Sequence, residues 1–239
     1  MSDAAVHAPQ WLMYGLFDPS RTRPEVIERL ADVTGVYDQF VRTIEGESLS
    51  VVVSAVPEGV QLSSPSVQEI IAFKRVVDAT FDGGPVIPLR FGTVVQTEEQ
   101  ARAVMREKES IYVDLLGRLD GQVEMGICMR LKERETEEDG PPSYRSDRPG
   151  TAYLLARQQS IARQRERAEA AATPFREALE PLATSVSMSP RHDAEDPLSI
   201  AFLVPRESAD AFRETAGTVA APGVDDVEVV GPWAPYSFV

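Results

Sequence analysis

The sequence of 239 residues predicts an α+β protein with two domains. Stretches with strand-like alternation are interspersed with stretches of helical periodicity along the chain. Hydrophobic residues make up 43% and charged residues 26%, as in folded domains rather than disordered or fibrous chains. Residues 133–150, ERETEEDGPPSYRSDRPG, have no apolar periodicity, so we expect a solvated linker or long loop there. This segment is the predicted domain boundary.

The N-terminal domain, residues 1–132, is predicted to be a mixed β/α sandwich. Its patterns indicate, in order, a strand at 11–17, a short helix at 25–31, strands at 36–44 and 49–56, a helix at 65–81, a strand at 85–95, a helix at 97–119 and a strand at 121–131. On the helix at 65–81 we expect these side chains to face the core: Val67, Ile70, Ile71, Val77 and Phe81. On the helix at 97–119 we expect Ala101, Val104, Met105, Ile111, Leu115, Leu116 and Leu119 to do so.

The C-terminal domain, residues 151–230, is predicted to be ferredoxin-like, an antiparallel sheet with helices on one face. A long helix begins near Thr151, and we expect Thr173 and Pro174 to break it, because proline removes a helical hydrogen bond. Strands at 184–190 and 198–206, a helix at 207–221 and a strand at 224–232 follow. The order α, β, β, α, β is most of the ferredoxin-like pattern.

The sequence argues against nucleic-acid binding and against membrane insertion. The net charge is −14, whereas phosphate binding needs a basic surface. The N-terminus has no secretory signal, and no apolar run approaches the ~18 residues of a membrane span. One cysteine allows no internal disulfide, which fits the cytoplasm. We therefore expect a cytoplasmic protein.

No catalytic, cofactor or metal site is predicted. His7 and His192 lie in polar segments and are expected to be solvated, and Cys128 is expected to be an inert buried thiol. No Cys/His pair has ligand spacing, and the turn Asp82-Gly83-Gly84-Pro85 lacks the lysine and helix start of a phosphate loop. The usual combination of base, nucleophile and charge stabiliser is therefore missing.

Two sets of charged residues stand out. Arg90, between Leu89 and Phe91, is expected to be buried and to form a structural pair with Glu124, although a ligand-binding role or a solvent-exposed arginine remains open. Residues 141–167 carry a net charge of +4 against the acidic average. Four arginines on the long helix could be a solvated face or a docking site for an acidic partner or RNA: Arg157, Arg163, Arg165 and Arg167.

The tail, residues 231–239, has three large aromatic side chains, Trp233, Tyr236 and Phe238, on a segment that Pro232 and Pro235 are expected to keep extended. Side chains of this size are not expected to stay in water. They either dock on their own protein, between the domains and with Trp233 as the largest anchor, or insert into a partner.

Several motifs in the same order resemble the gas vesicle GvpF/GvpL family. They are VIPLRFGT at 86–93, G-x-x-E at 121–124 and the terminal GPWAPYSFV, with weaker matches at WLMYGLF and SIAFLVPR. Ala234 stands where the family usually has proline. The motifs span nearly the whole chain.

The resemblance implies a non-enzymatic accessory protein of gas vesicle assembly, associated with the vesicles. Its expected partner is the small hydrophobic shell protein, with other gas vesicle accessory proteins as further candidates. It could act before or during polymerisation, or as a minor vesicle component. The alternatives are a small-ligand sensor or enzyme on the ferredoxin-like domain, or an RNA-binding module using the arginine-rich helix.

Overall fold

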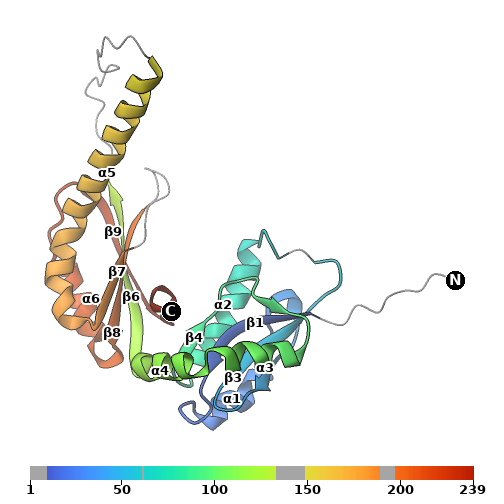
Figure 1. Cartoon of the computed structure of the whole chain (residues 1–239). Coiled ribbons are helices and arrows are strands. Elements are labelled where there is room, and N and C mark those ends of the chain that lie inside the picture. Colours follow the sequence, from blue (N-terminus) through green and yellow to red (C-terminus); the bar gives the residue numbers. More distant parts are fainter. Residues whose placement is uncertain (1–9, 61, 133–148, 189–196) are drawn as a thin grey trace. The chain divides into compact units, whose positions relative to one another are not determined.

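The chain forms two compact units in a computed structural model that describes residues 10–60, 62–132, 149–188 and 197–239 (Figure 1). The N-terminal unit consists of Met1–Glu124 together with Pro232–Val239, and the C-terminal unit is Met125–Gly231. The end of the chain therefore belongs to the unit that contains its beginning. The predicted linker at 133–150 lies almost entirely outside the described residues.

The N-terminal unit is built on an antiparallel sheet in which β1 is central. The strand order is β2-β3-β1-β4, and β5 pairs with β1 beside β4. The strands are β1 (Gln10–Phe17), β2 (Val41–Glu45), β3 (Ser50–Val56), β4 (Val86–Pro88) and β5 (Val94–Val95). β1 and β3 are buried along nearly their whole length, which matches their almost continuous apolar sequence.

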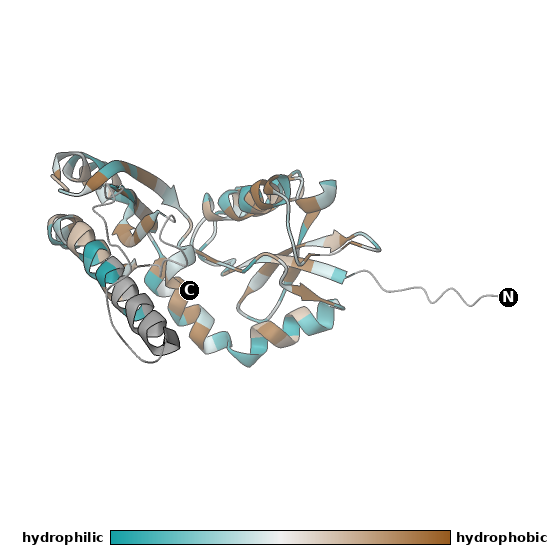
Figure 2. Cartoon of the chain, turned by 90° about the horizontal axis from the view of Figure 1, so that it is seen from above, coloured by the Kyte–Doolittle hydropathy of each residue, from teal (hydrophilic) through white to brown (hydrophobic). Residues whose placement is uncertain are grey.

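Helices contact this sheet at several strands. The first two, α1 (Pro24–Leu30) and α2 (Val67–Phe81), pack on each other, and α2 also contacts β1 and β4. The others are α3 (Glu98–Glu107), which contacts β2 and β5, and α4 (Glu109–Leu119), which contacts β4. Figure 2 shows hydrophilic and hydrophobic residues in turn along the helices, as expected for amphipathic helices.

Two expected strands and one expected helix of this unit differ in the structure. The predicted strand at 36–44 begins with a 3-10 turn (Val36–Asp38), because Tyr37 and Asp38 have positive φ angles of 58° and 55°. The predicted strand at 85–95 is split into β4 and β5 around Gly92, whose φ is +86°. The predicted helix at 97–119 is divided into α3 and α4 at Lys108, which has non-helical angles (φ −129°, ψ 26°). Val104 and Ile111, expected in the core, are 38% and 58% exposed.

The C-terminal unit is ferredoxin-like. Its strand order is β7-β8-β6-β9, and its elements follow one another as β-α-β-β-α-β. They are β6 (Gln122–Leu131), α5 (Pro149–Leu179), β7 (Ser185–Met188), β8 (Leu198–Pro205), α6 (Ala209–Thr218) and β9 (Val224–Trp233), with 3-10 turns at Glu180–Leu182, Arg206–Ser208 and, in the tail, Tyr236–Phe238. Phe202 of β8 and Phe212 of α6 meet edge to face in its core, with ring centroids 5.2 Å apart.

The expected domain boundary near Lys132 is wrong, because β6 pairs with β8 and β9 in the second sheet. The alternation of β6 was interpreted correctly, since Val123, Met125, Ile127 and Met129 are all fully buried. Only its partners could not be predicted from local sequence. β6 supplies the first strand that the α, β, β, α, β pattern lacked.

Both units share one topology. In the N-terminal unit β1, α1, β2, β3, α2 and β4 also follow one another as β-α-β-β-α-β, and the strand order β2-β3-β1-β4 matches β7-β8-β6-β9 position by position. The sequence shows no convincing internal repeat, so the repetition is visible only at the level of the fold.

The long helix α5 continues through Pro174, so the expected break at Thr173 and Pro174 is wrong. Phe175 and Leu179, beyond the proline, are almost completely buried, and Ala172 before it is fully buried. Packing on both sides of the proline therefore stabilises one continuous helix. The unpaired carbonyl that proline leaves belongs to Ala170, an exposed residue whose carbonyl water can reach.

Candidate interaction surface

Glu124 is the buried polar residue around which the tail is arranged. It lies near the start of β6, is 7% exposed, and accepts two hydrogen bonds from Ser237: one from the backbone N–H at 2.7 Å and one from Oγ at 2.8 Å. A buried carboxylate needs such donors, because burial without them is costly. The contact joins residues that are 113 positions apart in sequence.

The expected pair between Arg90 and Glu124 is wrong. Arg90 is exposed, and within the described part of the chain no carboxylate lies within salt-bridge distance of its guanidinium. The turn through Gly92 directs the residues after Leu89 out of the sheet, so the apolar neighbours of Arg90 do not enclose it. Sequence analysis missed Ser237 as the partner, because a serine between two aromatic residues carries no recognisable signal.

The tail is less extended and more exposed than expected. Trp233 ends β9, and Tyr236–Phe238 forms a single 3-10 turn. Ala234 is fully buried, whereas Trp233 and Tyr236 are each 37% exposed, so Trp233 is not the most buried anchor. The role of Trp233, Tyr236 and Phe238 as anchors for a partner stays a prediction.

Trp233 and Tyr236 both lie beside α2. The Lys74 ammonium is 5.6 Å from the Trp233 ring centroid, which is cation–π distance, and it also forms a 2.6 Å salt bridge with Asp78. Burial, and then the charges of Asp78 and Glu124, raise the pKa of Tyr236. The tail therefore covers the part of α2 around Lys74 and Asp78.

The first two turns of α2 expose apolar side chains that were expected in the core. Val67 is 73% exposed, Ile70 43% and Ile71 47%. The expectation is confirmed for Val77 and Phe81, which are buried together with Phe73, Val76 and Thr80, so the core-facing side is shifted around the helix relative to the prediction. A capping box between Ser66 and Glu69 fixes its start.

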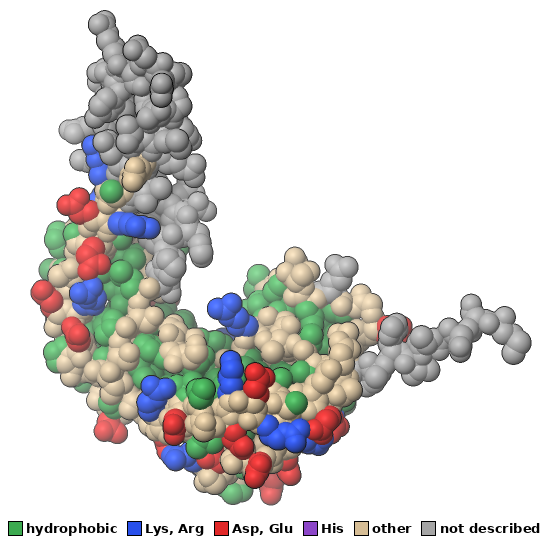
Figure 3. All heavy atoms as spheres, in the orientation of Figure 1, with side chains coloured by type: hydrophobic (Ala, Val, Ile, Leu, Met, Phe, Trp, Pro, Cys, Tyr) green, Lys and Arg blue, Asp and Glu red, His purple; other side chains and the backbone are tan. Residues whose placement is uncertain are grey.

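Three of the four arginines singled out on α5 have described side chains. Arg163, Arg165 and Arg167 are exposed, and Arg167 donates a 2.8 Å hydrogen bond to the Lys132 carbonyl. The side chain of Arg157 lies outside the described residues. On the face seen in Figure 3, basic and acidic side chains are interspersed. The docking role of these arginines stays a prediction.

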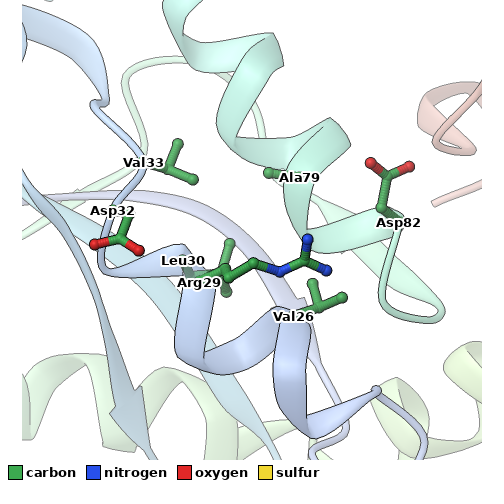
Figure 4. A pocket seen from close by; sticks show the side chains of 7 residues that line it. All are labelled: Val26, Arg29, Leu30, Asp32, Val33, Ala79 and Asp82. Carbon is green, nitrogen blue, oxygen red and sulfur yellow. The ribbon is translucent and has the colours of Figure 1, made fainter.

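A shallow cavity of about 320 Å3 lies between α1 and α2. Figure 4 shows the seven lining residues, with the Asp32 and Asp82 carboxylates on opposite sides and Arg29 between them. The lining includes no histidine, cysteine or serine, so it offers neither a hydroxyl or thiol nucleophile nor an imidazole base. This cavity gives little support to the sensor or enzyme alternative.

Of the residues considered for chemistry, the structure describes Cys128. Cys128 is half-buried, with its Sγ 3.7 Å from the Ser199 hydroxyl. His7 and His192 lie outside the described residues. Among the residues that the structure describes, no group of three or more His, Cys, Asp or Glu side chains could hold a metal ion, and no helix is long and apolar enough to cross a membrane.

The unfolding free energy of the N-terminal unit should depend on the ionisation of Glu124. Burial raises the pKa of Glu124 above its ordinary value of 4.5, and the Ser237 hydrogen bonds only partly oppose this shift. The folded protein therefore binds more protons than the unfolded chain just above pH 4.5, so stability should fall as the pH rises through that window. Denaturant titrations followed by tryptophan fluorescence should show this decline in the parent and a weaker decline in Glu124→Gln. Equal pH dependence in the two proteins would contradict the assignment. Tyr236, whose pKa is raised by burial and then by the charges of Asp78 and Glu124, is unchanged in this variant.

The chain is similar to gas vesicle proteins over nearly its whole length. Residues 10–239 match the family described as "Gas vesicle synthesis protein GvpL/GvpF". Gas vesicle protein F of Streptomyces sp. (strain CB03234) is 29% identical over 95% of this chain and 98% of its own length. Gas vesicle protein L of the same strain is 30% identical over a segment that covers 64% of this chain and 61% of that relative.

Two solved structures have the same fold. The crystal structure of GvpF from Anabaena sp. PCC7120 superposes with a TM-score of 0.74 at 21% identity, covering 96% of this chain and 95% of that one. GvpF from Microcystis aeruginosa gives a TM-score of 0.71 at 19% identity, covering 97% and 98%. The family match, which begins in β1 and ends with the tail that contacts Glu124, leads to one conclusion: this chain belongs to the GvpL/GvpF family of gas vesicle synthesis proteins.

Proposed function

We propose that this protein binds the small shell protein of gas vesicles and keeps it from aggregating before or during polymerisation. A gas-filled shell stays dry inside only if its subunits have a strongly apolar face. Such a face aggregates in water until it is assembled, so an accessory protein that covers it would help assembly. The binding would take place in the cytoplasm, at the growing vesicle.

The observation that supports this proposal is the exposure of aliphatic side chains on α2. The chain that carries them has a net charge of −14. The charge keeps the protein itself dispersed, while Val67, Ile70 and Ile71 offer apolar contact. Membership of the GvpL/GvpF family supports a role in gas vesicles. Other accessory proteins of the vesicle are further candidate partners.

The test mixes the purified protein with shell subunit freshly solubilised from vesicles, at about 50 mM and about 500 mM salt. We expect a complex and delayed aggregation, measured by co-sedimentation and light scattering, with only a modest effect of salt because the contact is mainly apolar. An unrelated globular protein of similar negative charge serves as the control and should not delay aggregation.

Two results would change the proposal. A steep loss of binding at high salt would assign the contact to the arginines of residues 145–167 instead of to an apolar surface. Absence of a complex at both salt concentrations, with unchanged aggregation, would contradict the assembly role and favour the sensor or enzyme alternative.

A further inference from the structure

Helix α2 exposes apolar side chains next to the side that packs on the core. Val67, Ile70 and Ile71 are spaced so that they share one side of the helix, and Lys74 and Asp78 continue that side at successive turns. The core of the N-terminal unit uses the neighbouring side, from Phe73 to Phe81, and Ile70 lies one heptad before the buried Val77. The apolar surface of the helix is therefore wider along its first turns than packing on the sheet requires.

The tail covers only the second half of the outward side. Trp233 lies against Lys74, and the ring of Tyr236 is near Asp78, whereas Val67, Ile70 and Ile71 remain exposed. Trp233 and Tyr236 are themselves 37% exposed, so they extend the aliphatic surface with partly accessible aromatic rings. We call these five residues the α2–tail surface.

Folding does not explain this surface. Burying a large aliphatic side chain fully contributes about 1.5–3 kcal/mol. Val67, Ile70 and Ile71 gain only part of this, because 73%, 43% and 47% of their surface stays exposed. They also have a lower helix propensity than leucine or alanine. Exposed apolar groups gathered on one side of a helix are typical of a binding site. The five residues of the surface carry no charge, and the Lys74–Asp78 salt bridge beside them is neutral as a pair.

The size and charge of the surface indicate what occupies it. Five partly exposed side chains are far fewer than the roughly 20–30 residues a side of a stable protein interface. Two copies of this chain would also bring together net charges of −14 each. Both arguments disfavour a dimer and favour a short apolar segment that binds transiently and is released, as assembly of a polymer requires.

We propose that the α2–tail surface docks a short apolar segment of the gas vesicle shell subunit. This inference rests on the proposed function and names the surface that performs it. The aliphatic residues of α2 contact the apolar side chains of the segment, and Trp233 and Tyr236 border them at one end.

The test compares two double variants in the shell-subunit binding assay. Ile70→Gln/Ile71→Gln removes the aliphatic part of the surface, and Val104→Gln/Ile111→Gln makes the same type of change at exposed positions on α3 and α4 of the same unit. Glutamine is a good helix former, so neither pair should disturb its helix. We expect the α2 variant to bind at least about tenfold more weakly and the control to bind like the parent. Val67→Gln, at a position 73% exposed, should weaken binding without any change in melting temperature.

The outcomes separate this inference from the function on which it rests. If the parent binds the shell subunit and the α2 variants bind equally well, the surface assignment is wrong while the proposed function stands. If the parent does not bind, both are wrong. If sedimentation shows a dimer of the parent that Ile70→Gln/Ile71→Gln dissociates, the occupant is a second copy of this chain and the inference is overturned.

Discussion

Ending the chain after Trp233 is expected to lower the free energy of unfolding of the N-terminal unit by about 3 kcal/mol or more. The truncation leaves the carboxylate of Glu124 without its two donors, and an unsatisfied buried charged group costs at least about 1–3 kcal/mol. It also removes Ala234, which is fully buried, and uncovers the part of α2 beneath Tyr236. Both tryptophans, Trp11 and Trp233, belong to this unit and are retained, so their fluorescence reports its unfolding specifically.

Two further variants show which part of the tail is responsible. Ser237→Ala removes one hydrogen bond but keeps the backbone donor, so it should cost only about 1 kcal/mol. Glu124→Gln in the truncated chain should recover part of the loss, because a neutral amide is less costly to bury than a charge. If truncation leaves stability and protease resistance unchanged but abolishes binding of the shell subunit, the tail is a partner-binding element rather than a stabilising one.

Gly35→Ala is expected to destabilise the same unit by about 3 kcal/mol, at the upper end of what overpacking usually costs. A Cβ atom at Gly35 would lie 2.4 Å from the Tyr14 hydroxyl oxygen. Tyr14 has little freedom to move, because its hydroxyl bonds to Ser54 Oγ at 2.7 Å, accepts from the Val36 N–H at 2.9 Å, and its ring packs on Phe73. The Gly35 backbone itself is ordinary, with φ −88°, so the effect is one of space rather than of backbone strain.

Gly117→Ala is the matched control within the same unit. Gly117 lies in α4, and the nearest atom to its added Cβ would be Arg21 Nη2 at 3.9 Å, an ordinary contact. Alanine in a helix interior is preferred over glycine by about 0.5–1 kcal/mol, so this variant should be slightly more stable than the parent. Denaturant titrations followed by tryptophan fluorescence measure both. Equal stabilities of Gly35→Ala and Gly117→Ala would show that the Tyr14 cluster can rearrange at no cost.

Much of the fold could be predicted from local sequence. The strands β1, β3, β6 and β8 and the helices α1, α2 and α6 lie close to where periodicity placed them, because each has a clear apolar side or run. The motifs spread over the chain indicated the family correctly. Errors of position came from backbone angles that depend on a few residues, such as the positive φ of Tyr37 and the non-helical Lys108.

The sequence by itself determined the buried apolar strands, the α+β class and the family of this protein. Only the tertiary structure decided which sheet β6 joins, which side of α2 faces the core and which residue satisfies Glu124. Strand partners are chosen by contacts between distant segments. The apolar surface of α2 is wider than the part that packs on the sheet, so the local pattern does not say which of its apolar side chains are buried. The hydrogen bonds from Ser237 to Glu124 join residues 113 positions apart, so they form only when the chain folds.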